Sequence, residues 1–134
     1  RPRTKWILPE YGEHERMRDA AKCVLFWDCH HNHPCSIWAR KSQGNYRWLY
    51  SLFLYLMKEY TRRYFKHHTC ESMAPILERC PEGIQAVKQT PFALAMPEQY
   101  REEDPVESYR RYYIEDKRRF ARYRYTRCPS WLDG

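Results

Sequence analysis

The chain has 134 residues, a formal net charge of +7 at pH 7 and a 43% share of hydrophobic residues. This length allows one domain with a real core, and no apolar run approaches the length of a membrane-spanning helix. Basic charge combined with twelve Tyr and five Trp favours a polyanion such as DNA or RNA as partner, with no membrane association. The first residue is Arg rather than Met, so we expect a trimmed chain or a fragment.

The N-terminal part of the chain carries weak secondary-structure signals. Residues 1–12 contain Pro and Gly and are predicted to be irregular, whereas apolar residues recur at helical spacing over 14–27. Pro34 suits the first turn of a short helix that carries Trp38, with His33 flanking its start.

The longest predicted helix begins at Ser42 and runs to about Lys66. A Ser at this position caps a helix by accepting a hydrogen bond from an early backbone N–H. Apolar side chains cover most of the helix circumference, which predicts a buried central helix. They are Trp48, Leu49, Leu52, Phe53, Leu54, Leu56, Met57 and Tyr60.

Proline and glycine punctuate the region that follows. A short helix is predicted over 70–79, interrupted by Pro75, and 81–103 then forms a long Pro-rich connection. Connections of this length inside a compact domain are often functional.

The next helix has a well-marked start. Asp104 caps it, Pro105 takes the first helical position, and Glu107 completes a capping box. The helix is predicted to run to about Arg122. Its expected inner face consists of Val106, Tyr109, Tyr113 and Phe120.

No segment shows the alternation of a β-strand, so the predicted fold class is all-α. We expect a single helical domain over 1–134, with a long central helix and a basic C-terminal helix joined by the Pro-rich connection. The six Cys could indicate disulfides, but helix-like segments and only four Gly are unlike a small disulfide scaffold. Reduced thiols and a cytoplasmic location are therefore predicted.

The first candidate site is the run Cys-His-His-Asn-His-Pro-Cys at 29–35. His, Asn and Cys side chains transfer protons, read base edges and bind metals. Zinc would need four well-spaced ligands, and no second pair supports the two Cys, so no metal is predicted and a structural zinc site stays an alternative. A second alternative is a His that caps the next helix and packs on Trp38.

The second candidate site lies on the long helix. Asn45, Leu52 and Glu59 are spaced by seven residues and therefore share one face. Glu59 lies near Arg62 and Arg63, so it is a candidate acid/base or electrostatic group. The alternative is an ion pair between Glu59 and one of these arginines that anchors the helix end.

The third candidate is the C-terminal helix and tail, 106–128, where eight Lys and Arg face three Asp and Glu. Tyr side chains alternate with them, so phosphates could pair with Arg while bases stack on Tyr. The plainer alternative is a solvated Arg-rich helix. The predicted nucleic-acid contacts are Arg110, Arg111, Tyr113, Lys117, Arg118 and Arg122.

Short motifs across 25–132 together resemble one family. They are His30-x-Asn32-His33-Pro34, Trp38-Ala39-Arg40-Lys41-Ser42, Asn45-Tyr46-x-Trp48-Leu49, Glu59-Tyr60-x-x-Arg63-Tyr64, Thr90-Pro91-Phe92-Ala93-x-Ala95-Met96-Pro97-x-x-Tyr100, Asp104-Pro105-Val106-x-Ser108-Tyr109-Arg110-x-Tyr112-Tyr113, Lys117-x-x-Phe120-Ala121-Arg122 and Pro129-x-Trp131. This pattern resembles small phage and bacterial proteins described as pyrimidine-dimer DNA glycosylase-like, of the endonuclease V type.

The resemblance implies a helical, cofactor-free enzyme that binds DNA and acts on damaged or modified pyrimidines in a bacterial or phage-infected cell. Such glycosylases use an N-terminal amine as nucleophile and a Glu that assists. By resemblance, Glu59 would assist, while His33 and Asn32 would contact the target nucleotide or aid proton transfer. The substrate-binding residues would be His30, Trp38, Asn45, Tyr46, Trp48 and Arg63.

The chain departs from the family at its start. Residues 1–24 match poorly, and a further N-terminal segment of the family is absent, so a preceding segment or a protein partner would complete the site. A non-catalytic nucleic-acid-binding or assembly protein that retains the fold is therefore the alternative function.

Overall fold

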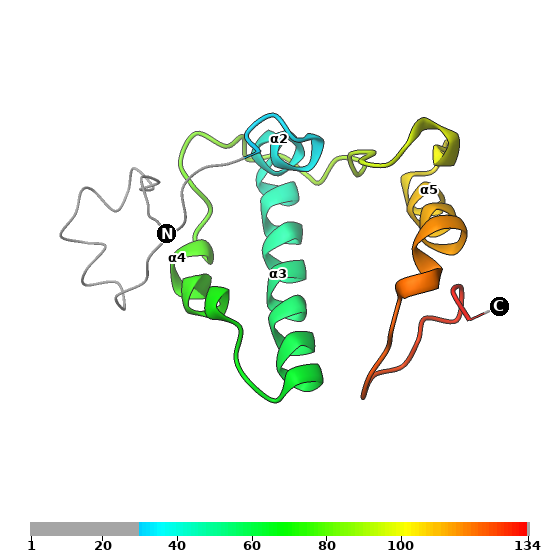
Figure 1. Ribbon diagram of the computed structural model, residues 1–134. Coiled ribbons are helices and arrows are strands. Elements are labelled where there is room, and N and C mark those ends of the chain that lie inside the picture. The colour runs from blue at the N-terminus through cyan, green and yellow to red at the C-terminus, as the bar shows by residue number, and fades with distance from the viewer. Residues whose placement is uncertain (1–29, 134) are drawn as a thin grey trace. The chain divides into compact units, whose positions relative to one another are not determined.

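The computed structural model describes residues 30–133, and the chain divides into two compact units, Arg1–Thr90 and Pro91–Gly134 (Figure 1). The described residues form helices and connections without a strand, which confirms the predicted all-α class. None of the described helices is long and apolar enough to cross a bilayer. Elements expected within 1–29 lie outside the described residues, and the single domain stays a prediction.

Two consecutive helices form the first part of the N-terminal unit. Helix α2, Pro34–Lys41, begins at the predicted proline, and helix α3, Gln43–Tyr64, is the predicted long helix. Ser42 separates them in an extended conformation, and its Oγ accepts a hydrogen bond from Asn45 N at 3.0 Å. The single extended residue ends α2 and caps α3, so the chain changes direction there.

The chain turns back after α3. Phe65 adopts the left-handed conformation (φ 55°, ψ 32°), and its N–H donates to the Thr61 carbonyl at 2.8 Å, an arrangement that commonly ends helices. The 3₁₀ turn η2, Thr69–Met73, and the one-turn helix α4, Ala74–Leu77, follow. Pro75 lies in the first turn of α4, so it helps to start this helix rather than interrupt one.

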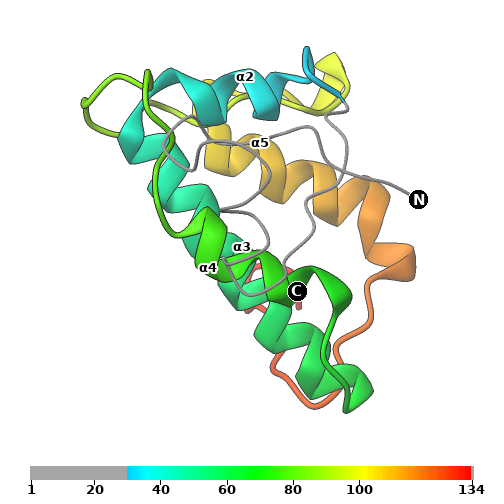
Figure 2. The same ribbon diagram turned by 90° about the vertical axis from the view of Figure 1, so that its left-hand side faces the viewer.

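Tyrosine hydroxyls hold α4 beside α3 (Figures 1 and 2). Tyr46 donates to the Leu77 carbonyl at 2.7 Å, and Tyr50 donates to the Ala74 carbonyl at 3.1 Å. The Leu77 carbonyl lies at the end of α4, where a helix leaves its carbonyls without internal partners, whereas the Ala74 carbonyl also accepts from Glu78 N at 3.0 Å.

The expectation that α3 is buried on most sides is wrong. Leu52 and Leu56 are 37% and 53% exposed, and the fully buried side chain on α3 is the polar Asn45. Among the described residues of this unit, α2 packs against α3, and the one-turn helix α4 is hydrogen-bonded to α3. Because α2 and α4 are short, they cover only one side of the 22-residue helix α3. The buried apolar side chains of the unit are Trp38, Met73 and Ile76.

The connection that leaves α4 returns to the start of α3. Gln43 N donates to the Gln85 carbonyl at 2.8 Å, and Gly44 N donates to the Val87 carbonyl at 3.1 Å. These are first-turn N–H groups, which have no partner within their own helix. A Cβ on Gly44 would lie 2.3 Å from Gln89 N, so the close approach requires glycine.

The C-terminal unit contains the 3₁₀ turn η3, Glu98–Tyr100, and helix α5, Pro105–Tyr112. The predicted cap is confirmed, because Asp104 Oδ1 accepts from Val106 N at 2.8 Å. The predicted uniform helix to Arg122 is wrong: a π-helical turn, Tyr113–Lys117, and a 3₁₀ turn, Arg118–Phe120, follow α5.

The inner face of α5 also differs from the prediction. Val106, Tyr113 and Phe120 are 38%, 42% and 55% exposed, whereas Ser108 is fully buried. Ser108 Oγ accepts from Glu102 N at 2.7 Å and so fastens the helix to the preceding loop. The π-helical and 3₁₀ turns change the number of residues per turn, so a 3.6-residue period does not predict the buried face beyond α5.

Aromatic and apolar side chains form the core of this unit. Met96, Tyr100 and Leu132 are buried, and the rings of Tyr100 and Tyr112 lie 5.0 Å apart. Tyr109 donates its hydroxyl to the Ala93 carbonyl at 2.5 Å and thereby fixes the connection against α5.

Replacing Gly44 by Ala tests the close approach between α3 and the returning connection. Helix propensity alone would make Gly44→Ala stabilising by about 1 kcal/mol. Because the new Cβ meets backbone atoms, we expect the free energy of unfolding to fall by about 2 kcal/mol. Urea unfolding measures it, with Ser51→Ala on the exposed side of α3 as control, expected within about 0.5 kcal/mol of the parent. A stabilised Gly44→Ala protein would contradict this packing.

Candidate nucleic-acid interface

The histidine run caps a helix. His33 is the N-cap of α2, and its Nδ1 accepts from Cys35 N at 3.1 Å, as the capping alternative predicts. The His30 carbonyl accepts from His33 N at 2.9 Å, so the run closes a turn immediately before α2. Asn32 is exposed in that turn. His33 thus uses one ring nitrogen for the backbone.

The described cysteines give no support to a metal centre. Among residues 30–133, no three His, Cys, Asp or Glu side chains are grouped to hold an ion. Cys35, Cys70 and Cys128 are free thiols. Cys29, the first residue of the run, lies outside the described residues.

Asn45 uses its whole side-chain amide within the fold. Its Nδ2 donates to the Trp38 carbonyl at 2.8 Å and to Thr90 Oγ1 at 2.9 Å, and its Oδ1 accepts from Thr90 N at 2.8 Å. The side chain is fully buried. An amide with both N–H groups and its oxygen engaged has little capacity left for a nucleotide base.

The aromatic residues expected beside Asn45 also support the fold. The Trp38 and Trp48 rings meet edge to face, with centroids 5.8 Å apart and planes at 88°. Trp38 is buried and Trp48 is 37% exposed, so they form packing around the α2–α3 junction rather than the walls of a described pocket. Tyr46, as noted, is bonded to α4.

Glu59 lies far from this junction. It lies fourteen positions after Asn45 on α3, which corresponds to about 21 Å along the helix axis. Glu59 Oε1 accepts from Arg63 Nε at 2.7 Å, and its Oε2 accepts from Arg62 Nη1 at 3.2 Å. This is the ion pair of the alternative interpretation. The structure therefore does not bring Glu59 and Asn45 into one site.

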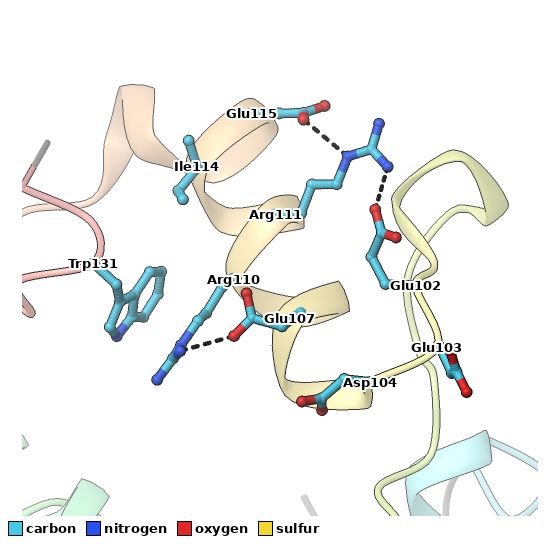
Figure 3. Close-up of a pocket in the computed structure, with 9 residues that line it drawn as sticks. All are labelled: Glu102, Glu103, Asp104, Glu107, Arg110, Arg111, Ile114, Glu115 and Trp131. Atoms are coloured by element: carbon cyan, nitrogen blue, oxygen red, sulfur yellow. Dashed lines mark hydrogen bonds and ion pairs between the residues drawn. The ribbon is translucent and has the colours of Figure 1, made fainter.

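An open depression of about 580 Å³ lies on the C-terminal unit (Figure 3). Five carboxylates outnumber two arginines in its lining, which also includes Ile114 and Trp131. The charged lining residues are Glu102, Glu103, Asp104, Glu107, Glu115, Arg110 and Arg111.

Arg110 and Arg111 pair with carboxylates of this depression (Figure 3). Arg111 donates to Glu115 at 2.9 Å and to Glu102 at 2.6 Å, and these hydrogen bonds raise the pKa of Arg111. Arg110 donates to Glu107 at 2.8 Å and lies over the Trp131 ring, 5.8 Å from its centroid. Excess carboxylates repel phosphate, so this setting disfavours both arginines as contacts to a nucleic-acid backbone.

Positive charge collects beyond α5, in the segment 117–127, here called the basic segment. It contains six Lys and Arg and no Asp or Glu. Phe120 and Tyr125 within it are 55% and 68% exposed. The cations are Lys117, Arg118, Arg119, Arg122, Arg124 and Arg127, and all the arginines are exposed.

Several cations of the basic segment are positioned by local contacts. Lys117 Nζ lies 4.9 Å from the Tyr112 ring centroid and 5.4 Å from that of Phe120. A hydrogen bond with Tyr112 is the main cause that raises the pKa of Lys117, so this amine stays charged at neutral pH. Arg119 Cζ lies 5.2 Å from the Phe120 ring, and Arg122 donates to the Arg119 carbonyl at 3.3 Å.

The predicted nucleic-acid residues thus fall into two environments. Lys117, Arg118 and Arg122 belong to the basic segment, whereas Tyr113 packs edge-on against Trp131 at 6.4 Å. The predicted set omitted five residues of the basic segment with exposed side chains, and the absence of acidic residues over 117–127 was the signal that could have found them. They are Arg119, Phe120, Arg124, Tyr125 and Arg127.

Comparison of the chain with protein-family models, with curated proteins and with solved structures finds no match. The glycosylase-like resemblance therefore stays a prediction, and functional inference depends on the side-chain geometry.

Substitution of Asn45 distinguishes a structural amide from a substrate-binding one. Asn45→Ala removes the partner of the buried Trp38 carbonyl and of the part-buried Thr90 N–H, so we expect the free energy of unfolding to fall by about 3 kcal/mol. Glu59→Gln serves as the contrast, with an expected loss below about 1 kcal/mol because its ion pairs are partly exposed. Chemical denaturation measures both, and equal losses in the two variants would contradict these roles.

Proposed function

We propose that this protein binds nucleic acid through the basic segment. The observation that carries the proposal is a run of eleven residues with six cations, no carboxylate and two exposed aromatic rings. Arg matches phosphate in a bidentate fork, and closely spaced cations release condensed counterions when they meet a nucleic-acid backbone.

The distribution of charge within the C-terminal unit supports a defined binding surface. Acidic residues gather before and within the first turns of α5, where Glu102, Glu103 and Asp104 line the depression. The basic segment begins beyond the end of α5. An acidic region disfavours a polyanion while a neighbouring basic one attracts it, so the backbone is directed to one part of the unit.

The internal contacts of the basic segment are compatible with binding. Arg119 forms a 3.6 Å ion pair with Asp116 while its side chain is 75% exposed. Exposed pairs of this kind contribute less than about 1 kcal/mol, so a phosphate can replace the carboxylate at little cost.

Binding without catalysis is the form of the proposal that the geometry favours. His33 caps α2, Asn45 bonds to Trp38 and Thr90, and Glu59 pairs with two arginines. His33 and Glu59, expected to take part in catalysis, and Asn45, expected to bind substrate, therefore have partners within the fold, whereas Asn32 is exposed in the turn before α2. The base-processing enzyme stays a prediction, tested by incubation with duplexes that contain modified pyrimidines and by borohydride trapping of an imine.

The triple variant Arg119→Gln/Arg124→Gln/Arg127→Gln tests the proposed surface. If each arginine meets one phosphate, the slope of log affinity against log salt should become shallower by about 2 to 3. Fluorescence anisotropy of a labelled oligonucleotide over a salt series measures this slope.

The matched control removes the same charge elsewhere. Lys41→Gln/Lys58→Gln/Lys88→Gln neutralises three exposed lysines of the N-terminal unit and should leave the slope unchanged. Equal effects of the two triple variants would mean that net charge, and not the basic segment, causes binding. No binding by the parent protein would overturn the proposal.

A further inference from the structure

We infer that the basic segment prefers single-stranded nucleic acid, with unpaired bases stacking on Phe120 and Tyr125. This inference rests on the proposed function and specifies its ligand. Its starting point is that the two most exposed rings of the C-terminal unit, at 55% and 68%, both lie within the acid-free run of cations.

Burial does not account for these two rings. Large aromatic side chains contribute to stability mainly through the apolar surface that they remove from water, and both rings leave most of that surface exposed. Tyr100, which is buried against Tyr112 in the same unit, shows the ordinary packing role. Exposed rings among arginines are instead the pattern of a stacking platform for bases.

The backbone at Tyr125 supplies a second observation. Its φ of 59° places a bulky residue in the left-handed region, which disfavours residues with a Cβ. Strained conformations of this kind cost about 1–3 kcal/mol and concentrate at functional sites. At Tyr125 the strained residue carries an exposed ring, so the strain holds no side chain in the core.

The cations beside Phe120 fit the same ligand. Lys117 Nζ and Arg119 Cζ lie 5.4 Å and 5.2 Å from the centroid of its ring. Both cations lie over the ring, so a base that stacks on Phe120 replaces one of them and brings its phosphate close to the displaced positive charge. In a duplex the faces of the bases are already stacked on one another, so the rings could not use them and only phosphate contacts would remain.

Three labelled ligands of equal length separate the contributions of bases and phosphates. They are a single strand of mixed sequence, the same strand annealed to its complement, and a strand whose sugars carry no bases. Anisotropy titrations of the full chain should show the tightest binding for the single strand. The strand without bases should bind between about fivefold and 150-fold more weakly for each ring that stacks.

Substitutions at Tyr125 test the ring without disturbing the backbone. Asn tolerates the left-handed conformation, so Tyr125→Asn should fold at least as stably while it loses the stacking surface. We expect its affinity for the single strand to fall at least about fivefold with an unchanged salt slope, because phosphate contacts remain. Tyr125→Phe keeps the ring and should bind like the parent, and Phe120→Leu should resemble Tyr125→Asn.

The outcomes distinguish the two proposals. If the duplex and the base-free strand bind as tightly as the single strand, or Tyr125→Asn binds as the parent does, stacking is overturned while electrostatic binding stands. If none of the three ligands binds, the proposed function itself fails.

Discussion

A buried amide organises the N-terminal unit. Asn45 bonds to the last turn of α2 through the Trp38 carbonyl and to the end of the long connection through Thr90, while it lies in the first turn of α3. Two consecutive helices and the end of a connection 45 residues further along the chain therefore meet at one side chain. A buried polar group is tolerated when all its hydrogen bonds are made, and unpaired it costs about 1–3 kcal/mol. The position of the connection, and with it the tight approach at Gly44, depends on this set of bonds.

The same kind of hydrogen bonding occurs at the first two candidate sites. Hydrogen-bonding side chains such as His33 and Asn45 are suited both to catalysis and to fastening backbone segments. In this fold each of these two side chains forms a hydrogen bond with a backbone group. Glu59 is suited both to acid–base chemistry and to ion pairing, and two arginines in the following turn of α3 engage it.

The C-terminal unit follows a different principle, the separation of charge along the chain. Carboxylates gather around the N-terminus of α5, where the helix dipole favours negative charge, and Arg110 and Arg111 lie in its last turn, where the dipole favours positive charge. The basic segment follows further along the chain, after Glu115 and Asp116, and contains no carboxylate of its own. The exposed rings of Phe120 and Tyr125 add a means of base contact to the proposed binding surface.

The sequence by itself determined the helical class, the caps at Ser42 and Asp104 and the start of each main helix, because these depend on interactions within a few residues. Tertiary structure decided which faces are buried: α3 buries Asn45 and exposes Leu56, and α5 buries Ser108. Tertiary structure also decided that Arg111 pairs with two carboxylates, Glu102 from the preceding loop and Glu115 from the following turn. Burial and pairing across the chain depend on which segments meet, and local periodicity carries no information about those partners.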